Sequence, residues 1–212
     1  MPAQDVRGRR RTASSATNGV QDQFDMNEYN EQFVAQAMPA YTEMTRLGQG
    51  WSTMSVTAYA ALVTRPTTTA AVQIYNGYPS GSNICLIIDR IFCEWRIATA
   101  VASSAIMYAS VGPQTAIVNA LTTRGNSGSA YGGSVAATVD DTVTDNGWFP
   151  WGNSITGALA AATPNGGHDS RVEGRIIVRP GHALCLHVVA SVTGDTFVQG
   201  ASWYERALTL VG

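Results

Sequence analysis

The feature that most constrains the fold is an alternating pattern between residues 171 and 208. Side chains of a strand point alternately to its two faces, so apolar residues at every second position indicate a strand with one buried face. The clearest run places these residues on one face: Leu184, Leu186, Val188, Ala190 and Val192. Pro180-Gly181 and Gly194-Asp195 flank the run with sequences typical of turns. The pattern predicts three strands in an antiparallel meander, with a half-buried middle strand.

A meander of this size cannot bury its apolar face alone, so it requires a second sheet or a partner chain. The run 84–96 begins with five residues that are apolar on both faces, which indicates a strand buried between layers or at an interface. Shorter strands are expected at 71–75 and 105–111. We therefore predict a mainly β fold, an antiparallel β-sandwich or jelly roll over residues 49–212. The glycine-rich stretch 124–167 is expected to be a surface insertion.

The residues before this β-rich region divide into an arm and a helical segment. Residues 1–23 have too little apolar content to fold alone, and we expect a flexible basic arm with an arginine cluster: Arg7, Arg9, Arg10 and Arg11. Residues 24–48 are expected to form a helical segment with a helix from Met26 to Met38, because Asp25 and Glu28 resemble a capping box and apolar residues follow at helical spacing. Pro39 ends this helix or restarts it as a second short turn. The helix is expected to pack on its own subunit or on a neighbour.

The charge composition indicates contact with other subunits. Charged residues make up 13% of the chain, about half the usual share, so a monomer would expose a weakly charged surface. The net charge of −2 argues against nucleic-acid binding by the whole domain. Nucleic acid or an acidic partner is expected only at the arginine cluster, whose alternative role is that of a solubilising tail.

Several chemistries and compartments are disfavoured by the residue types present. The chain contains no lysine, which excludes a P-loop and Schiff-base catalysis. Cys85, Cys93 and Cys185 show no metal-ligand spacing, and Cys85 and Cys93 are expected on one strand face, too far apart for a disulfide. We expect all three to be small buried side chains. The sequence shows no membrane-spanning run and no signal peptide, which indicates synthesis in a reducing cytoplasm.

Residue types found in catalytic and metal sites occur here without a catalytic arrangement. His168, Asp169 and Ser170 are contiguous and cannot form a triad, so we expect a loop or turn. His182 and His187 are expected on opposite faces of a strand, where they cannot share a metal. A solvated turn is expected for three acidic residues that match no EF-hand spacing: Asp140, Asp141 and Asp145. The sequence predicts no enzyme, no metal and no cofactor.

An aromatic patch within the glycine-rich stretch is a candidate interface. Trp148, Phe149 and Trp151 occur within four residues. Aromatic side chains are favoured both in cores and at interfaces, so the patch could anchor the stretch to its own subunit or to another.

The basic arm, the single helix and the lysine-free β-domain occur together with a closing pattern I-x-V-x-P-G-x-A-L-x-L … W-Y-E. The pattern consists of Ile176, Val178, Pro180, Gly181, Ala183, Leu184, Leu186, Trp203, Tyr204 and Glu205. Mostly over residues 70–208, the chain resembles virion structural proteins of tailed bacteriophages. The resemblance implies a jelly roll, usually trimeric, that decorates or builds a capsid and has no catalytic residues.

On this resemblance we expect a capsid decoration or cement protein, made in the host cytoplasm and located in the virion. It would form a homotrimer and bind the major capsid protein or another virion protein through the arm and helix, including Phe33 and Tyr41. Two alternatives remain: a shell-forming coat protein whose arginine arm faces nucleic acid, and a receptor-binding module. In the second, the 124–167 loop would bind glycan with Trp148 or Trp151 as a stacking platform. A cupin-like enzyme is disfavoured by the lack of a His-x-His pair.

Overall fold

The computed structural model describes residues 42–97, 103–152, 155–157 and 166–208. The chain divides into two units, Met1–Thr42 and Glu43–Gly212, and the described residues belong almost entirely to the second. Its elements, in order, are α1 (Thr42–Arg46), β1 (Gly50–Met54), β2 (Tyr59–Ala60), β3 (Thr69–Asn76), the 3-10 turn η2 (Ser80–Ser82), β4 (Ile84–Ile97), β5 (Ser103–Pro113), β6 (Thr123–Gly125), β7 (Val135–Thr142), β8 (Phe149–Pro150), β9 (Ile155–Gly157), β10 (Gly167–Val178), β11 (His182–Ala190) and β12 (Thr196–Ala207).

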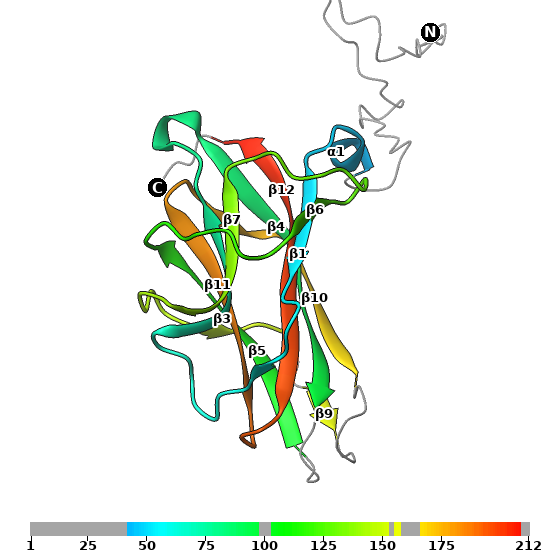
Figure 1. Ribbon diagram of the computed structural model, residues 1–212, viewed down its shortest axis with the longest axis vertical. Coiled ribbons are helices and arrows are strands. Elements are labelled where there is room, and N and C mark those ends of the chain that lie inside the picture. The colour runs from blue at the N-terminus through cyan, green and yellow to red at the C-terminus, as the bar shows by residue number, and fades with distance from the viewer. Residues whose placement is uncertain (1–41, 98–102, 153–154, 158–165, 209–212) are drawn as a thin grey trace, which may run out of the picture. The chain divides into compact units, whose positions relative to one another are not determined.

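The strands form two antiparallel sheets that pack against each other (Figure 1). The first, called sheet 1, has the order β10-β4-β12-β1-β6, with β2 also paired to β12. The second, called sheet 2, has the order β7-β3-β11-β5-β8, with β9 also paired to β5. The prediction of a mainly β antiparallel sandwich is confirmed.

The inner faces of the two sheets share one apolar core. From sheet 2, β11 contributes Leu184 and Leu186, which are fully buried. From sheet 1, Trp95 and Phe197 pack with their ring centroids 5.1 Å apart, and Trp203 is also fully buried. Large apolar side chains at every second position of these strands therefore hold the sheets together.

The three strands predicted near the C-terminus are present, but the meander is wrong. β10 and β12 lie on either side of β4 in sheet 1, whereas β11 lies between β3 and β5 in sheet 2. Both turns that join these three strands therefore cross from one sheet to the other. Alternation predicts that a strand has an apolar face, but it does not specify which strand pairs with it.

The middle strand β11 is buried on both faces rather than half-buried. Ala183 and Cys185 point away from the main core, yet they are 0% and 1% exposed. They pack with Val143 and Trp148 in a second apolar cluster. Residues 143–148, here called the strap, connect β7 at one edge of sheet 2 to β8 at the other edge. The strap therefore covers the outer face of the sheet.

Hydrogen bonds attach both ends of the strap to the rest of the subunit. The Val143 amide donates to the carbonyl oxygen of Thr68, and Trp148 Nε1 donates to the carbonyl oxygen of Thr67, each over 2.9 Å. In between, Asp145 forms an ion pair with Arg65 at 3.0 Å. Trp148 therefore anchors the strap within its own subunit.

A β-bulge in β4 changes which of its residues face the core. Arg90 pairs with Ser202 of β12, and Ile88 pairs with the next residue, Trp203, so Asp89 is an extra residue. Leu86 and Ile88 face the core before the bulge, and the inward positions after it are Ile91, Cys93 and Trp95. The prediction that Cys85 and Cys93 share a face is wrong, because the bulge places them on opposite faces. All three cysteines are buried and free, as expected.

The 124–167 stretch is not a surface insertion throughout. Its residues 135–142 form β7, which pairs with β3 from Thr69 to Asn76, and β8 and β9 pair with β5. The loop predicted at His168–Ser170 is also wrong, because these residues pair with β4 as part of β10. These strands contain mainly small and polar residues, so apolar and polar residues alternate only weakly and the sequence does not predict the strands.

Among the N-terminal predictions, only the second short turn lies in the described part of the chain. It is α1, followed by Gly48 at φ 69°, in the left-handed region that favours glycine at a helix end. The basic arm, with Arg7, Arg9, Arg10 and Arg11, lies outside the described residues. So do the predicted helix before Pro39 and the candidate contact residues Phe33 and Tyr41.

Replacing Leu186 by Asp should prevent folding. The position is 0% exposed on the inner face, and an unpaired carboxylate there costs several kcal/mol. The matched control is Val118→Asp at a position that is 85% exposed. Circular dichroism during heating should show a cooperative transition for the control alone. A soluble Leu186→Asp variant that melts cooperatively would contradict this inner-face assignment.

Replacing Gly112 by Ala should destabilise the strap. An added Cβ would lie 2.5 Å from Cβ of Asn146, so the strap would have to move, at a cost of about 1–3 kcal/mol. Gly81→Ala is the control, because an added Cβ there meets nothing within 4 Å. Urea unfolding should give a lower midpoint for Gly112→Ala only. Equal midpoints for the two variants would show that the strap does not pack closely on sheet 2.

Candidate functional site

The three candidate interface aromatics have different environments. Trp148, the last residue of the strap, is 4% exposed, and Trp151 is half-buried against the main core. Arg175 lies over the Trp151 ring, 5.4 Å from its centroid. Only Phe149 is well exposed, at 67%. The two tryptophans thus anchor this stretch within the subunit, and Phe149 remains available for contact with a partner.

The titratable residues singled out in the sequence do not form a common site. His182 and His187 occupy opposite faces of β11, as predicted. Burial lowers the pKa of His187 and also that of His168, which lies in the other sheet. The turn predicted for the three acidic residues is wrong for Asp140 and Asp141, which lie in β7, whereas Asp145 lies in the strap and pairs with Arg65. Across residues 42–208, excluding the undescribed segments, no group of three His, Cys, Asp or Glu side chains could hold a metal ion.

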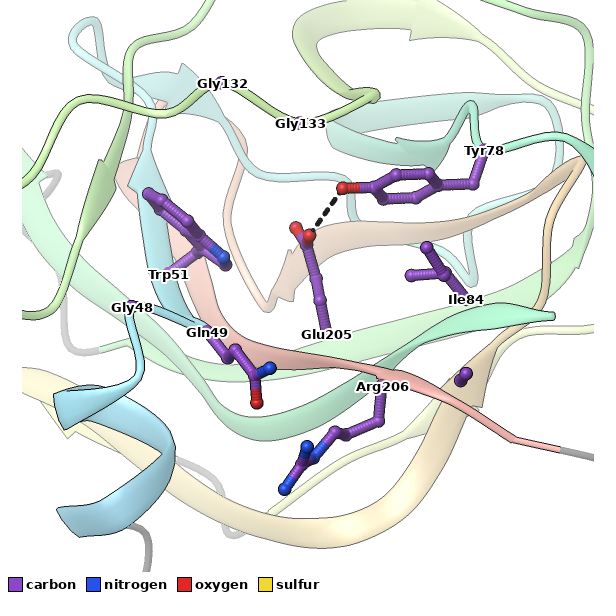
Figure 2. A pocket seen from close by; sticks show the side chains of 10 residues that line it. Gly48, Gln49, Trp51, Tyr78, Ile84, Gly132, Gly133, Glu205 and Arg206 are labelled. Atoms are coloured by element: carbon purple, nitrogen blue, oxygen red, sulfur yellow. Dashed lines mark hydrogen bonds between the residues drawn. The ribbon is translucent and has the colours of Figure 1, made fainter. Parts of the chain in front are cut away.

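A pocket of about 560 Å³ lies near the C-terminal end of β12 (Figure 2). Four segments that are distant in the sequence meet there: the turn after α1, the loop after β3, the loop before β7 and the last residues of β12. Its lining residues are Gly48, Gln49, Trp51, Tyr78, Ile84, Gly132, Gly133, Glu205, Arg206 and Ala207. It is the best candidate for a binding site among the described residues.

Glu205 is the central polar residue of this pocket. It follows Trp203 by two positions on β12 and therefore lies on the inward face of the strand, where the core ends. Its carboxylate accepts hydrogen bonds from Tyr78 Oη at 2.8 Å, Tyr131 Oη at 2.9 Å and Trp203 Nε1 at 3.2 Å. These three donors fix the carboxylate in position.

Aromatic rings form the walls around the carboxylate. The Trp51 and Tyr131 rings meet edge to face, with their centroids 4.7 Å apart. Tyr131 is held in turn, because its hydroxyl oxygen accepts a hydrogen bond from the Val135 amide at 2.9 Å. At Gly133 an added Cβ would lie 2.3 Å from Tyr131 Oη, so a larger residue there would displace this hydroxyl group.

The electrostatics of the pocket depend on Glu205. Burial and the nearby Glu205 carboxylate raise the pKa of Tyr131. Burial, followed by the hydrogen bond to Glu205, raises the pKa of Tyr78. Among the described lining residues Arg206 is the only cationic one, and it forms no ion pair with Glu205 (Figure 2). The described side chains thus leave the carboxylate charge without a cationic partner.

Sequence reasoning did not identify this site. In the sequence, Glu205 is only the last residue of the closing pattern, and no motif marks Tyr78 or Tyr131. One signal was available, because Glu205 continues the inward positions of Ala201 and Trp203, and a carboxylate in that position of a strand is unusual. The approach of Tyr78 and Tyr131 depends on loops, whose paths the sequence does not define.

Tyrosine ionisation offers a test of this site. A raised pKa in the folded state favours the neutral phenol, so the associated stabilisation is present below about pH 10 and is lost at higher pH. In an alkaline titration followed by phenolate absorbance, the folded chain should show a late phase. Tyr131→Phe should reduce its amplitude, and the urea-unfolded chain, the control, should lack it. Coincident titrations of folded and unfolded chain would contradict the arrangement around Glu205.

The described residues include no helix long and apolar enough to cross a membrane. No protein-family model and no curated protein sequence matches the chain.

Proposed function

We propose that this chain is a non-catalytic structural protein of a virion, of the capsid decoration or cement type. It would form a homotrimer through its β-domain and bind the major capsid protein or another virion protein. The observation that carries the proposal is the order of the strands in the two sheets.

The strand order supports a jelly roll. From β3 to β5, and again from β10 to β12, consecutive strands alternate between the sheets. Four strands of sheet 1 follow the order β1-β12-β4-β10, and four of sheet 2 follow β3-β11-β5-β8. The first and last strands of the sandwich are therefore neighbours, as expected when a long antiparallel ribbon is folded over into two Greek keys. Jelly rolls occur in capsid proteins, lectins and cupins, so the step from fold to function is an analogy.

Two features favour a capsid protein over a cupin-type enzyme or a glycan-binding protein. A cupin-type metal enzyme requires several metal-ligating side chains in one place, and the described residues contain no such group. The proposed glycan platform is weakened because Trp148 is 4% exposed and Trp151 is half-buried. The aromatic residues of the 124–167 stretch therefore support the fold more than they support ligand stacking.

The surface also favours contact with other protein subunits. Several apolar side chains are exposed on a chain in which only 13% of residues are charged. They include Met54 at 47%, Val56 at 86%, Val118 at 85% and Phe149 at 67% exposure. Apolar and aromatic side chains with few charges are typical of the centres of interfaces.

Light scattering on the purified chain should give a discrete mass three times that of one chain. A variant lacking residues 1–23 should form the same trimer, because the β-domain is proposed to make the contacts. It should also bind purified virions of the matching phage less well than the full chain. A monomer at all concentrations would contradict the trimeric decoration role. Large closed particles would instead favour the shell-forming coat protein.

A further inference from the structure

The pocket around Glu205 has no role in the proposed structural function. We propose that it is a binding site for an organic cation, a guanidinium or alkylammonium group. The ligand is either a free small molecule or a side chain presented by another protein. The inference depends on the pocket alone and not on the virion role.

The carboxylate of Glu205 is the centre of a small hydrogen-bond network. Tyr78, Tyr131 and Trp203 all have their hydrogen-bond donors directed at its two oxygens. A carboxylate has about four lone-pair sites, so one remains for a donor from a ligand. The three donors are neutral, and no ion pair between Glu205 and another described residue is present.

The walls of the pocket suit a cation. The face of an aromatic ring is negative, and it attracts ammonium and guanidinium groups within about 6 Å. In the view of Figure 2, the Glu205 carboxylate lies between the rings of Trp51 and Tyr78, beneath the loop that contains Gly132 and Gly133. A cation next to Glu205 would thus meet the carboxylate, with the partly exposed ring of Tyr78 beside it.

Other classes of ligand fit less well. An anion would be repelled by Glu205, and Figure 2 shows the guanidinium of Arg206 pointing away from that carboxylate. Calcium requires six to eight oxygen ligands, whereas this pocket contributes one carboxylate that is already hydrogen-bonded. A sugar ring would need a broad exposed aromatic face, and Trp51 is only 9% exposed. The volume of about 560 Å³ is sufficient for a cationic side chain or small molecule.

The test is an NMR titration of the full chain with butylguanidinium, tetramethylammonium and the neutral analogue butylurea. The indole N–H of Trp203 reports directly on Glu205, to which it donates. Each cation should shift this resonance with saturation, whereas butylurea at equal concentration should not. This comparison uses the unmodified chain and therefore does not depend on the folding of a variant. Shifts that are equal for butylurea and butylguanidinium, or unsaturable for both cations, would overturn the proposal.

Substitutions test the contribution of the charge. Glu205→Gln retains the size of the side chain and should weaken butylguanidinium binding by about tenfold or more. Glu94→Gln is the matched control, because Glu94 is an exposed carboxylate paired with Arg96 and lies outside the pocket. Unchanged affinity in a folded Glu205→Gln variant would overturn the proposal. So would saturable binding of a methyl glycoside in the absence of cation binding.

A further comparison distinguishes the two sources of the cation. A blocked Gly-Arg-Gly peptide presents the guanidinium as a protein side chain would. Tighter binding of this peptide than of butylguanidinium would identify a protein side chain as the ligand. Equal or weaker binding of the peptide would identify a free small molecule. Both results support a cation site, and failure of all cationic probes to bind would overturn it without affecting the virion proposal.

Discussion

The structure depends on the burial of large apolar side chains between two sheets. Trp95, Phe197 and Trp203 of sheet 1 and the leucines of β11 are fully buried, and no single sheet could cover them. At about 25 cal/mol per Å² of buried apolar area, side chains of this size each contribute on the order of 2–3 kcal/mol. Because strands alternate between the sheets from β3 to β5 and from β10 to β12, this core joins residues distant in the sequence.

Two local irregularities adapt the strands to this core. The bulge at Asp89 changes the alternation of β4, so that Leu86 and Trp95 both face inward although nine positions separate them. The strap closes the outer face of sheet 2, where β11 would otherwise expose Ala183 and Cys185. The bulge therefore keeps the inner face of β4 in sheet 1 apolar along its length. The strap shields the outer face of sheet 2 from solvent.

The same geometry produces the pocket. The inward alternation of β12 continues to Glu205, two residues beyond Trp203, where the core ends and the carboxylate meets the loops. The carboxylate is accommodated because Tyr78, Tyr131 and Trp203 donate to it. A charged group at the margin of a core costs less than one inside it, since solvent still reaches it.

The sequence by itself determined the fold class, the approximate positions of the main strands and the turns between them. Leu184 to Ala190 alternate clearly, and Pro180-Gly181 ends the preceding strand, because both signals act within a few residues. Only the tertiary structure decided the pairing of strands, the faces of Cys85 and Cys93 and the location of Trp148. It also brought Tyr78 and Tyr131 to Glu205. These features depend on contacts between distant segments, and alternation within one strand contains no information about the partner that covers it.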